Sequence, residues 1–219
     1  MPSDMQWLQR PWQDLRRWWL RYHMGLPEFA FILDPAPDNE WVSLDCETTG
    51  LNVGKDEIVS IGAVRIMGDR ILASERLELI VRPEKGVSAQ SIRIHQLRAR
   101  DVAQGMPVDE AVQRLLHFIG PRPLVGYYLE FDVAMLDKVL FPMLGWGLPQ
   151  PKIEVSALYH SLKMRQLTAQ QRQAPPEIDL RLATMMKDLG LPMRDAHNPV
   201  NDAVMAAMAF IKLRHLLGR

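Results

Sequence analysis

The sequence predicts an α/β domain with a mixed five-stranded sheet flanked by helices. Three hydrophobic runs come first, at residues 41–47, 58–66 and 71–81, and only a few turn-forming residues separate the last two. After residue 107, helical periodicity alternates with two short strand candidates. A hairpin followed by alternating strands and helices is typical of an α/β domain whose sheet is partly antiparallel.

The individual elements follow from periodicity and from the residues that interrupt it. Strands are expected at Trp41–Glu47, Ile58–Ile66, Ile71–Val81, Pro123–Tyr127 and Lys152–Val155, with a hairpin turn at 67–70. Helices are expected at 108–119, 130–144, 156–167, 179–189 and from 198 to the C-terminus. Asp179 and Asn198 are the expected N-caps of the last two. Residues 168–177, rich in Gln with two adjacent prolines, are expected to form a mobile loop.

Composition limits the classes of protein to consider. With 47% hydrophobic and 24% charged residues, a chain of 219 residues should fold around a sizeable core. Acidic and basic residues number 26 each, so nucleic-acid binding would have to come from a local surface. The only cysteine, Cys46, permits no intramolecular disulfide. Neither an 18-residue apolar run nor a signal peptide is found, and a cytoplasmic location is expected.

The N-terminal region is expected to be an appendage. Residues Met5–Met24 have an amphipathic helical pattern, with apolar positions at Leu8, Trp12, Leu15, Trp18, Trp19 and Tyr22. The turn-forming stretch 34–39 contains two prolines and separates this helix from the rest. We therefore expect an extension with linker over residues 1–38 and one domain over 39–219. The helix could dock as core, pair with a second copy, bind another protein or lie on an anionic membrane.

Two acidic residues on the first strand carry the strongest chemical signal. Side chains alternate along a strand, so Asp45 and Glu47 project from the same face, about 7 Å apart at the backbone. Two carboxylates so placed repel each other and favour a bound cation, although an arbitrary pair of this kind usually reaches solvent. The residues that follow, Thr48-Thr49-Gly50, make the pattern specific, because it should arise by chance in on the order of 1 in 10⁴ chains.

The first motif resembles that of the DEDD superfamily of 3′→5′ exonucleases, whose fold is RNase H-like. Within it, the chain is similar to the histidine-containing branch that includes the polymerase III proofreading subunit and ribonuclease T. The stretch 125–132 matches the second motif and would supply a third acid, Asp132. The stretch 197–203 matches the third, with Asp202 as fourth acid and His197 as the branch's histidine.

The third motif also has a local physical basis. Asn198 is a good N-cap and Pro199 a good first helical residue, so Asp202 falls near the first turn, where the helix dipole favours a carboxylate. His197 then lies in the loop before the helix. Each of these residues alone would be an ordinary surface group, and only their combination with the other motifs indicates a site.

Four acids predict a site for two hard cations, Mg²⁺ or Mn²⁺. Such a pair would activate the attacking water and stabilise the departing 3′ oxygen, and His197 would accept the proton from that water. The resemblance implies that nucleoside 5′-monophosphates are released one at a time from 3′ ends.

The resemblance also implies which residues contact the substrate. Thr48, Thr49 and Leu51 follow the first motif and would contact the terminal nucleotide, with Phe131 as a weaker candidate for stacking. His95 matches a family segment near the substrate's end, or is a polar residue on a helix face. Three arginines nearby could hold phosphates or form a solvated face: Arg93, Arg98 and Arg100.

The motifs depart from the family at positions that are not metal ligands. Tyr127-Tyr128 stands where similar enzymes often have His-Asn, and Pro199 where they have a small residue, which leaves substrate preference open. The leading hypothesis is an exonuclease acting on single-stranded DNA in repair, proofreading or turnover. RNA or oligoribonucleotide trimming is the second, and a non-catalytic nucleic-acid-binding module is the third. The sequence ends soon after Asp202, which favours a stand-alone nuclease or one recruited through its N-terminus.

Overall fold

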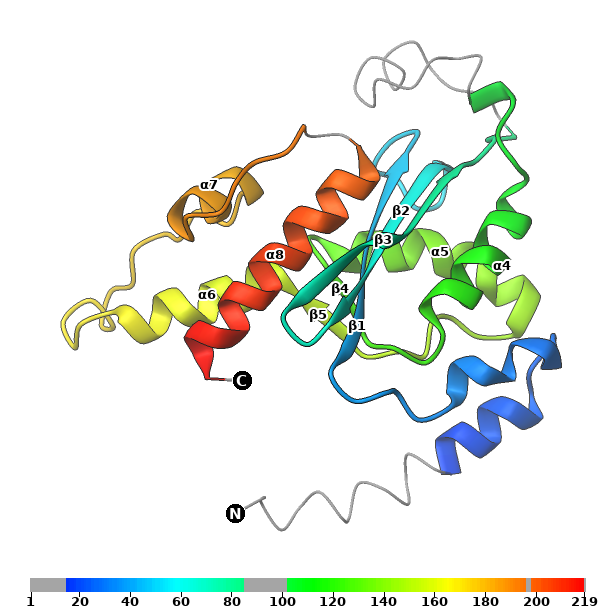
Figure 1. Ribbon diagram of the computed structural model, residues 1–219, viewed down its shortest axis with the longest axis horizontal. Helices are drawn as coiled ribbons and strands as arrows, with labels where there is room; N and C mark the ends of the chain where they lie inside the picture. Colours follow the sequence, from blue (N-terminus) through cyan, green and yellow to red (C-terminus); the bar gives the residue numbers. More distant parts are fainter. Residues whose placement is uncertain (1–14, 85–101, 196–197, 219) are drawn as a thin grey trace.

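The computed structural model describes residues 15–84, 102–195 and 198–218 and contains the predicted mixed sheet (Figure 1). Its five strands lie in the order β3-β2-β1-β4-β5. The first three strands pair antiparallel, and β1, β4 and β5 pair parallel. The strands are β1 (Glu40–Thr48), β2 (Ile58–Met67), β3 (Arg70–Ile80), β4 (Leu124–Gly126) and β5 (Lys152–Glu154).

The predicted helices are present with small changes in their bounds. They are α4 (Val108–Ile119), α5 (Leu129–Leu144), α6 (Val155–Gln166), α7 (Leu182–Asp188) and α8 (Pro199–Leu217), preceded by a 3-10 helix, η1 (Pro27–Leu33). The predicted N-cap at Asp179 is wrong, because the N-cap position of α7 is Arg181, whose side chain makes no capping hydrogen bond. The Asp179 carboxylate accepts hydrogen bonds from the Arg181 backbone N–H and the Thr184 hydroxyl, so it orders the approach to the helix.

The sheet separates two hydrophobic cores. Val42 and Leu44 of β1 pack in one core with α4, α5 and η1, while β2 residues such as Val64 pack in the other with α6, α7 and α8. Figure 1 shows the same arrangement, with α6, α7 and α8 together on one side of the sheet and α4 and α5 on the other. Because side chains alternate along a strand, Ser43, Asp45 and Glu47 of β1 face the other side of the sheet, where α8 packs.

The start of α8 rests directly on the sheet at Gly62 of β2. A Cβ at this position would lie 2.2 Å from the carbonyl carbon of Pro199, closer than any side chain tolerates. Gly62 is also the antiparallel partner of Asp45. The missing side chain therefore lets the first turn of α8 approach the sheet beside Asp45.

The segment predicted to be an N-terminal extension packs on the rest of the chain through residues other than the predicted stripe. Residues 15–22 are helical, and Leu20 of this helix and Met24 just after it are buried in the same core as α4 and α5. The aromatic side chains of Trp18 and Tyr22 are instead 61% and 75% exposed and stack on each other. The part of the predicted helix before residue 15 lies outside the described residues. Within the described ranges, no helix is both long and apolar enough to cross a membrane.

Candidate active site

Asp45 and Glu47 are two residues apart on β1 and point to the face that α8 covers. Their antiparallel partners on β2 are the small residues Gly62 and Ser60, which leave room above the sheet. The pairing between β1 and β2 becomes irregular immediately after Glu47. Such irregularities bend a strand and redirect its side chains, and this one ends the regular pairing at the two acids.

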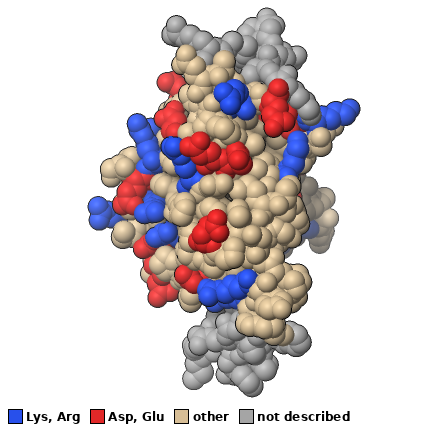
Figure 2. Space-filling view, turned by 90° about the vertical axis from the view of Figure 1, so that its right-hand side faces the viewer, with Lys and Arg blue, Asp and Glu red and all other residues tan. Residues whose placement is uncertain are grey.

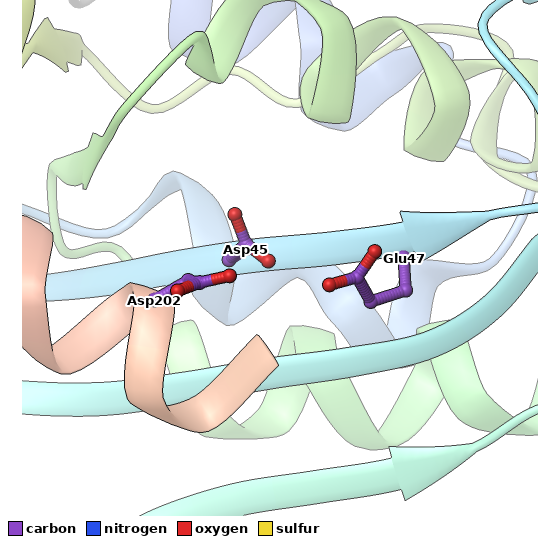
Figure 3. Close-up of side chains that lie close together, drawn as sticks. All are labelled: Asp45, Glu47 and Asp202. Carbon is purple, nitrogen blue, oxygen red and sulfur yellow. The ribbon is translucent and has the colours of Figure 1, made fainter. Parts of the chain in front are cut away.

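The third carboxylate comes from the first turn of α8. The Asn198 side chain caps this helix by accepting a hydrogen bond from the Asn201 backbone N–H at 3.0 Å, as predicted for an N-cap. Asp202 follows within the first turn. Figure 3 shows Asp202 approaching from α8 towards Asp45 and Glu47 on β1. One oxygen from each of the three carboxylates lies within 4.8 Å of the others.

The electrostatics of this group fit a bound cation. Loss of hydration raises the pKa of Asp45 well above its usual range, and repulsion from neighbouring carboxylates adds to it, in the order Asp132, Asp202 and Glu47. A divalent cation would remove this repulsion and replace the lost hydration. Carboxylate oxygens are the ligands that Mg²⁺ and Mn²⁺ prefer, so the donor set fits a hard metal ion.

Asp132 lies beside the three-carboxylate group but is not one of its members. It is buried in the first turn of α5, with 4% of its surface exposed. Burial raises its pKa well above the usual range, and a hydrogen bond from the Cys46 backbone N–H offsets part of that rise. Because Cys46 lies between Asp45 and Glu47 on β1, this hydrogen bond brings the second motif next to the first.

The two predicted histidines lie outside the described residues. His197 falls in the gap at 196–197 and His95 in the gap at 85–101, which also holds Arg93, Arg98 and Arg100. Their predicted roles therefore stay predictions.

The loop after β1 uses its threonine hydroxyls internally. The Thr48 hydroxyl donates to the Gly50 carbonyl at 2.7 Å, and the Thr49 hydroxyl donates to Asp56 at 3.0 Å. Leu51 is 87% exposed at this loop. Phe131 is partly buried against the core, one residue before Asp132. Of these four predicted substrate-binding residues, Leu51 is thus the one that exposes a large apolar side chain.

A pocket of about 240 Å³ adjoins two of the acids and contains residues that the motifs did not indicate. Asp45, Asp202 and Tyr127 contribute its polar side chains, and its other lining residues are Leu182, Ala183, Met193 and Met205. The Tyr127 hydroxyl accepts a hydrogen bond from the Leu182 backbone N–H at 3.2 Å, which ties β4 to α7. Burial raises the pKa of Tyr127 to about 12, so the phenol stays neutral. The only sign of Tyr127 in the sequence was that it stands where similar enzymes often have His.

Charge on the face of the molecule drawn in Figure 2 is mixed. Figure 2 shows acidic and basic side chains interspersed over one face of the described part of the molecule, without a continuous field of either sign. This agrees with the equal numbers of acidic and basic residues in the sequence.

Comparisons with known proteins agree with this arrangement. Residues 42–210 match the model of the RNase T family, described as exonuclease. The chain is 26% identical over 181 residues to a PolC-type DNA polymerase III of Thermotoga maritima, covering 82% of this chain but only 12% of that protein. It is 22% identical to the DNA polymerase III subunit epsilon of Aquifex aeolicus, covering 85% of this chain and 86% of that protein.

Solved structures show the same fold. E. coli exonuclease I in its zinc-bound complex with single-stranded DNA superposes with a TM-score of 0.68 and 13% identity, covering 84% of this chain and 42% of that chain. The matched family region contains both strand acids, the second-motif acid and Asp202. The chain therefore belongs to the RNase T family of exonucleases.

Proposed function

We propose that this protein is a metal-dependent 3′→5′ exonuclease that releases nucleoside 5′-monophosphates from single-stranded DNA. The observation that carries the proposal is the meeting of three carboxylates, Asp45, Glu47 and Asp202, within 4.8 Å in a chain of an exonuclease family. Carboxylates so close together are unfavourable in a folded protein unless a cation or protons neutralise them. Metal binding would account for their close approach.

The proposed roles follow from position. Asp45, Glu47 and Asp202 hold the metal, and the buried carboxylate of Asp132 completes the negative set beside them. Two bound Mg²⁺ or Mn²⁺ ions would activate the attacking water and neutralise charge on the phosphate and on the leaving oxygen. His197 remains the proposed acceptor of the water's proton.

The loop after β1 and the start of α5 are the proposed substrate contacts. Leu51 would pack against the terminal base, and Phe131 would stack on a base. Because the hydroxyls of Thr48 and Thr49 are engaged within the loop, their contacts to the nucleotide would come from backbone groups. His95 keeps its proposed place near the end of the substrate.

DNA is the proposed substrate because of the relatives' activities. Two similar proteins are named as DNA polymerase III components, and a structural neighbour holds single-stranded DNA. An RNA substrate would use the same acids, with added contacts to the 2′-hydroxyl. A non-catalytic binding module has no need of clustered, mutually repelling carboxylates, so it is the weaker alternative.

The test is digestion of single-stranded DNA and RNA of equal sequence. Each is labelled at the 5′ end in one set and at the 3′ nucleotide in another, with Mg²⁺, Mn²⁺ or EDTA. We expect 5′-labelled DNA to shorten progressively, 3′-labelled DNA to yield a labelled mononucleotide first, and EDTA to stop both. Asp45→Asn should be inactive, and Asp38→Asn, which changes an exposed linker acid, should match the wild type. If RNA were digested faster than DNA, RNA would become the proposed substrate. If the strands shortened from the 5′ end, the proposed 3′→5′ direction would be wrong.

The exposed aromatic face of the N-terminal helix is a proposed contact with a second copy of the chain. Leu15, Trp18, Trp19 and Tyr22 are each at least half exposed within eight residues, and such concentrated apolar surface usually marks an interface. Light scattering should show a dimer for the wild type and a monomer for the double variant Trp18→Ser, Tyr22→Ser. A monomeric wild type at assay concentrations would reject self-association.

A further inference from the structure

The turn that enters α5 is held in an unusual conformation. Tyr128, the N-cap residue, has φ 55° and ψ 33°, the left-handed region that residues with a Cβ seldom occupy. Its side chain makes no capping hydrogen bond, and 62% of its surface is exposed. A left-handed non-glycine residue persists where surrounding contacts impose it. The first backbone N–H groups of a helix also need acceptors from outside the helix.

Glu154, at the end of β5, supplies those acceptors. One carboxylate oxygen accepts from the Tyr128 backbone N–H at 3.2 Å, and the other accepts from the Leu129 backbone N–H at 2.9 Å. The first oxygen also accepts from the Ser156 backbone N–H at 3.1 Å and from the Ser156 hydroxyl at 2.7 Å. A single side chain thus joins the start of α5 to the start of α6.

The turn held by Glu154 lies in the chain between two residues of the candidate site, Tyr127 and Asp132. Tyr127, one residue before it, lines the pocket beside Asp45. Asp132 lies about one helical turn after Leu129 on α5 and is buried. The position of α5 along its axis therefore sets where the Asp132 carboxylate stands relative to the acids on β1.

A carboxylate at this place has an electrostatic cost. Burial raises the pKa of Asp132, and repulsion from Glu47 and from Glu154 raises it further. An ordinary N-cap of α6 would need only a short polar side chain, such as Asp or Ser. The longer side chain of Glu is needed only because it also reaches the backbone N–H groups at the start of α5.

From this geometry we propose that Glu154 is a positioning residue of the active site, which fixes the Tyr128 turn and thereby holds Asp132 in place for metal binding. The proposal rests on the proposed function only in taking the acids as the metal site. Residues that orient metal ligands typically change metal affinity by about 10–100-fold when they are replaced.

Glu154→Asp separates this role from simple capping. Aspartate is a preferred N-cap and should still accept from Ser156, so α6 keeps its cap. It is one methylene shorter and should no longer reach Tyr128 and Leu129. The matched control is Glu130→Asp, the same change on an exposed residue in the first turn of α5.

The measurements are Mn²⁺ affinity by titration calorimetry without nucleic acid, and the melting temperature in EDTA. We expect Glu154→Asp to weaken Mn²⁺ binding about tenfold with a melting temperature within about 2 °C of wild type, and Glu130→Asp to change neither. Adding Tyr128→Gly to Glu154→Asp should recover part of the affinity, because glycine adopts the left-handed conformation without strain.

Unchanged Mn²⁺ affinity in Glu154→Asp would overturn the proposal and leave Glu154 as a helix cap. A loss of melting temperature without a loss of affinity would overturn it equally. Because calorimetry needs no substrate, these outcomes are independent of whether the wild type digests DNA. A wild type that binds Mn²⁺ but degrades no nucleic acid would refute the proposed function and leave the role of Glu154 intact.

Discussion

Replacing Asp45 with Asn should stabilise the protein when metal is absent and remove its stabilisation by Mn²⁺. The three carboxylates of Asp45, Glu47 and Asp202 lie within 4.8 Å of one another, and Asp45 takes part in two of the three pairs. Two like charges 4.8 Å apart repel by about 3.5 kcal/mol at an effective dielectric constant of about 20. A proton on the metal-free site already relieves part of this repulsion, so we expect Asp45→Asn to gain about 1–3 kcal/mol in unfolding free energy.

The pH dependence of this gain has a definite sign. The pKa of Asp45 is raised in the folded protein, chiefly by burial and then by the neighbouring acids. The folded state therefore keeps a proton that the unfolded chain releases near pH 3.9, and the stability linked to that proton is lost as pH rises through the raised pKa. Metal-free wild type should lose stability as pH rises above about 4, and Asp45→Asn should lose less.

Urea unfolding followed by tryptophan fluorescence, with EDTA or with Mn²⁺, measures both effects. At a Mn²⁺ concentration of about 100 times the dissociation constant, the wild type should gain about 2.7 kcal/mol, and Asp45→Asn should gain little. Asp38→Asn, an exposed control, should stay within about 0.5 kcal/mol of wild type in each condition. A metal-free Asp45→Asn protein less stable than wild type, or one stabilised equally by Mn²⁺, would refute the reasoning.

Three further predictions test how the site is built. Gly62→Ala should destabilise the protein by about 1–3 kcal/mol and reduce nuclease activity, because the new Cβ would displace Pro199 and with it Asp202; urea unfolding and DNA digestion check this, and a fully active variant would contradict it. Asn198→Ala should cost about 1 kcal/mol through loss of the α8 cap, seen as a melting temperature lower by about 2–4 °C, whereas an unchanged value would exclude the cap's contribution. Leu51→Ala should leave stability within about 0.5 kcal/mol, since the side chain is exposed, but raise KM for DNA; an unchanged KM would remove Leu51 from the substrate contacts.

The elements with strong local signals could be predicted from the sequence. The β1 strand is one residue longer than predicted at each end and β2 one residue longer at its C-terminal end, and α8 begins directly after the predicted Asn198 cap. The shared face of Asp45 and Glu47 follows from strand alternation alone. These features depend on neighbouring residues in the chain, so local patterns are sufficient to predict them.

Features that depend on tertiary contacts could not be predicted in this way. Asp202 reaches β1 only because Gly62, 140 positions earlier in the chain, has no side chain to keep α8 away. Glu154 has the local pattern of an α6 cap, and its contact with α5 depends on the pairing of β4 with β5. The apolar stripe predicted for the N-terminal helix is largely exposed, and only packing shows that Leu20 and, just after the helix, Met24 are the buried residues.

The central claim is that the carboxylates of β1 and α8 hold the metal ion needed for hydrolysis. Anomalous diffraction from crystals grown with Mn²⁺ would test it most directly. We predict a peak bounded by Asp45, Glu47 and Asp202, with metal to oxygen distances of about 2.0–2.3 Å, which disappears in Asp202→Asn crystals. A peak elsewhere, or none between these acids under conditions in which the protein digests DNA, would contradict the account.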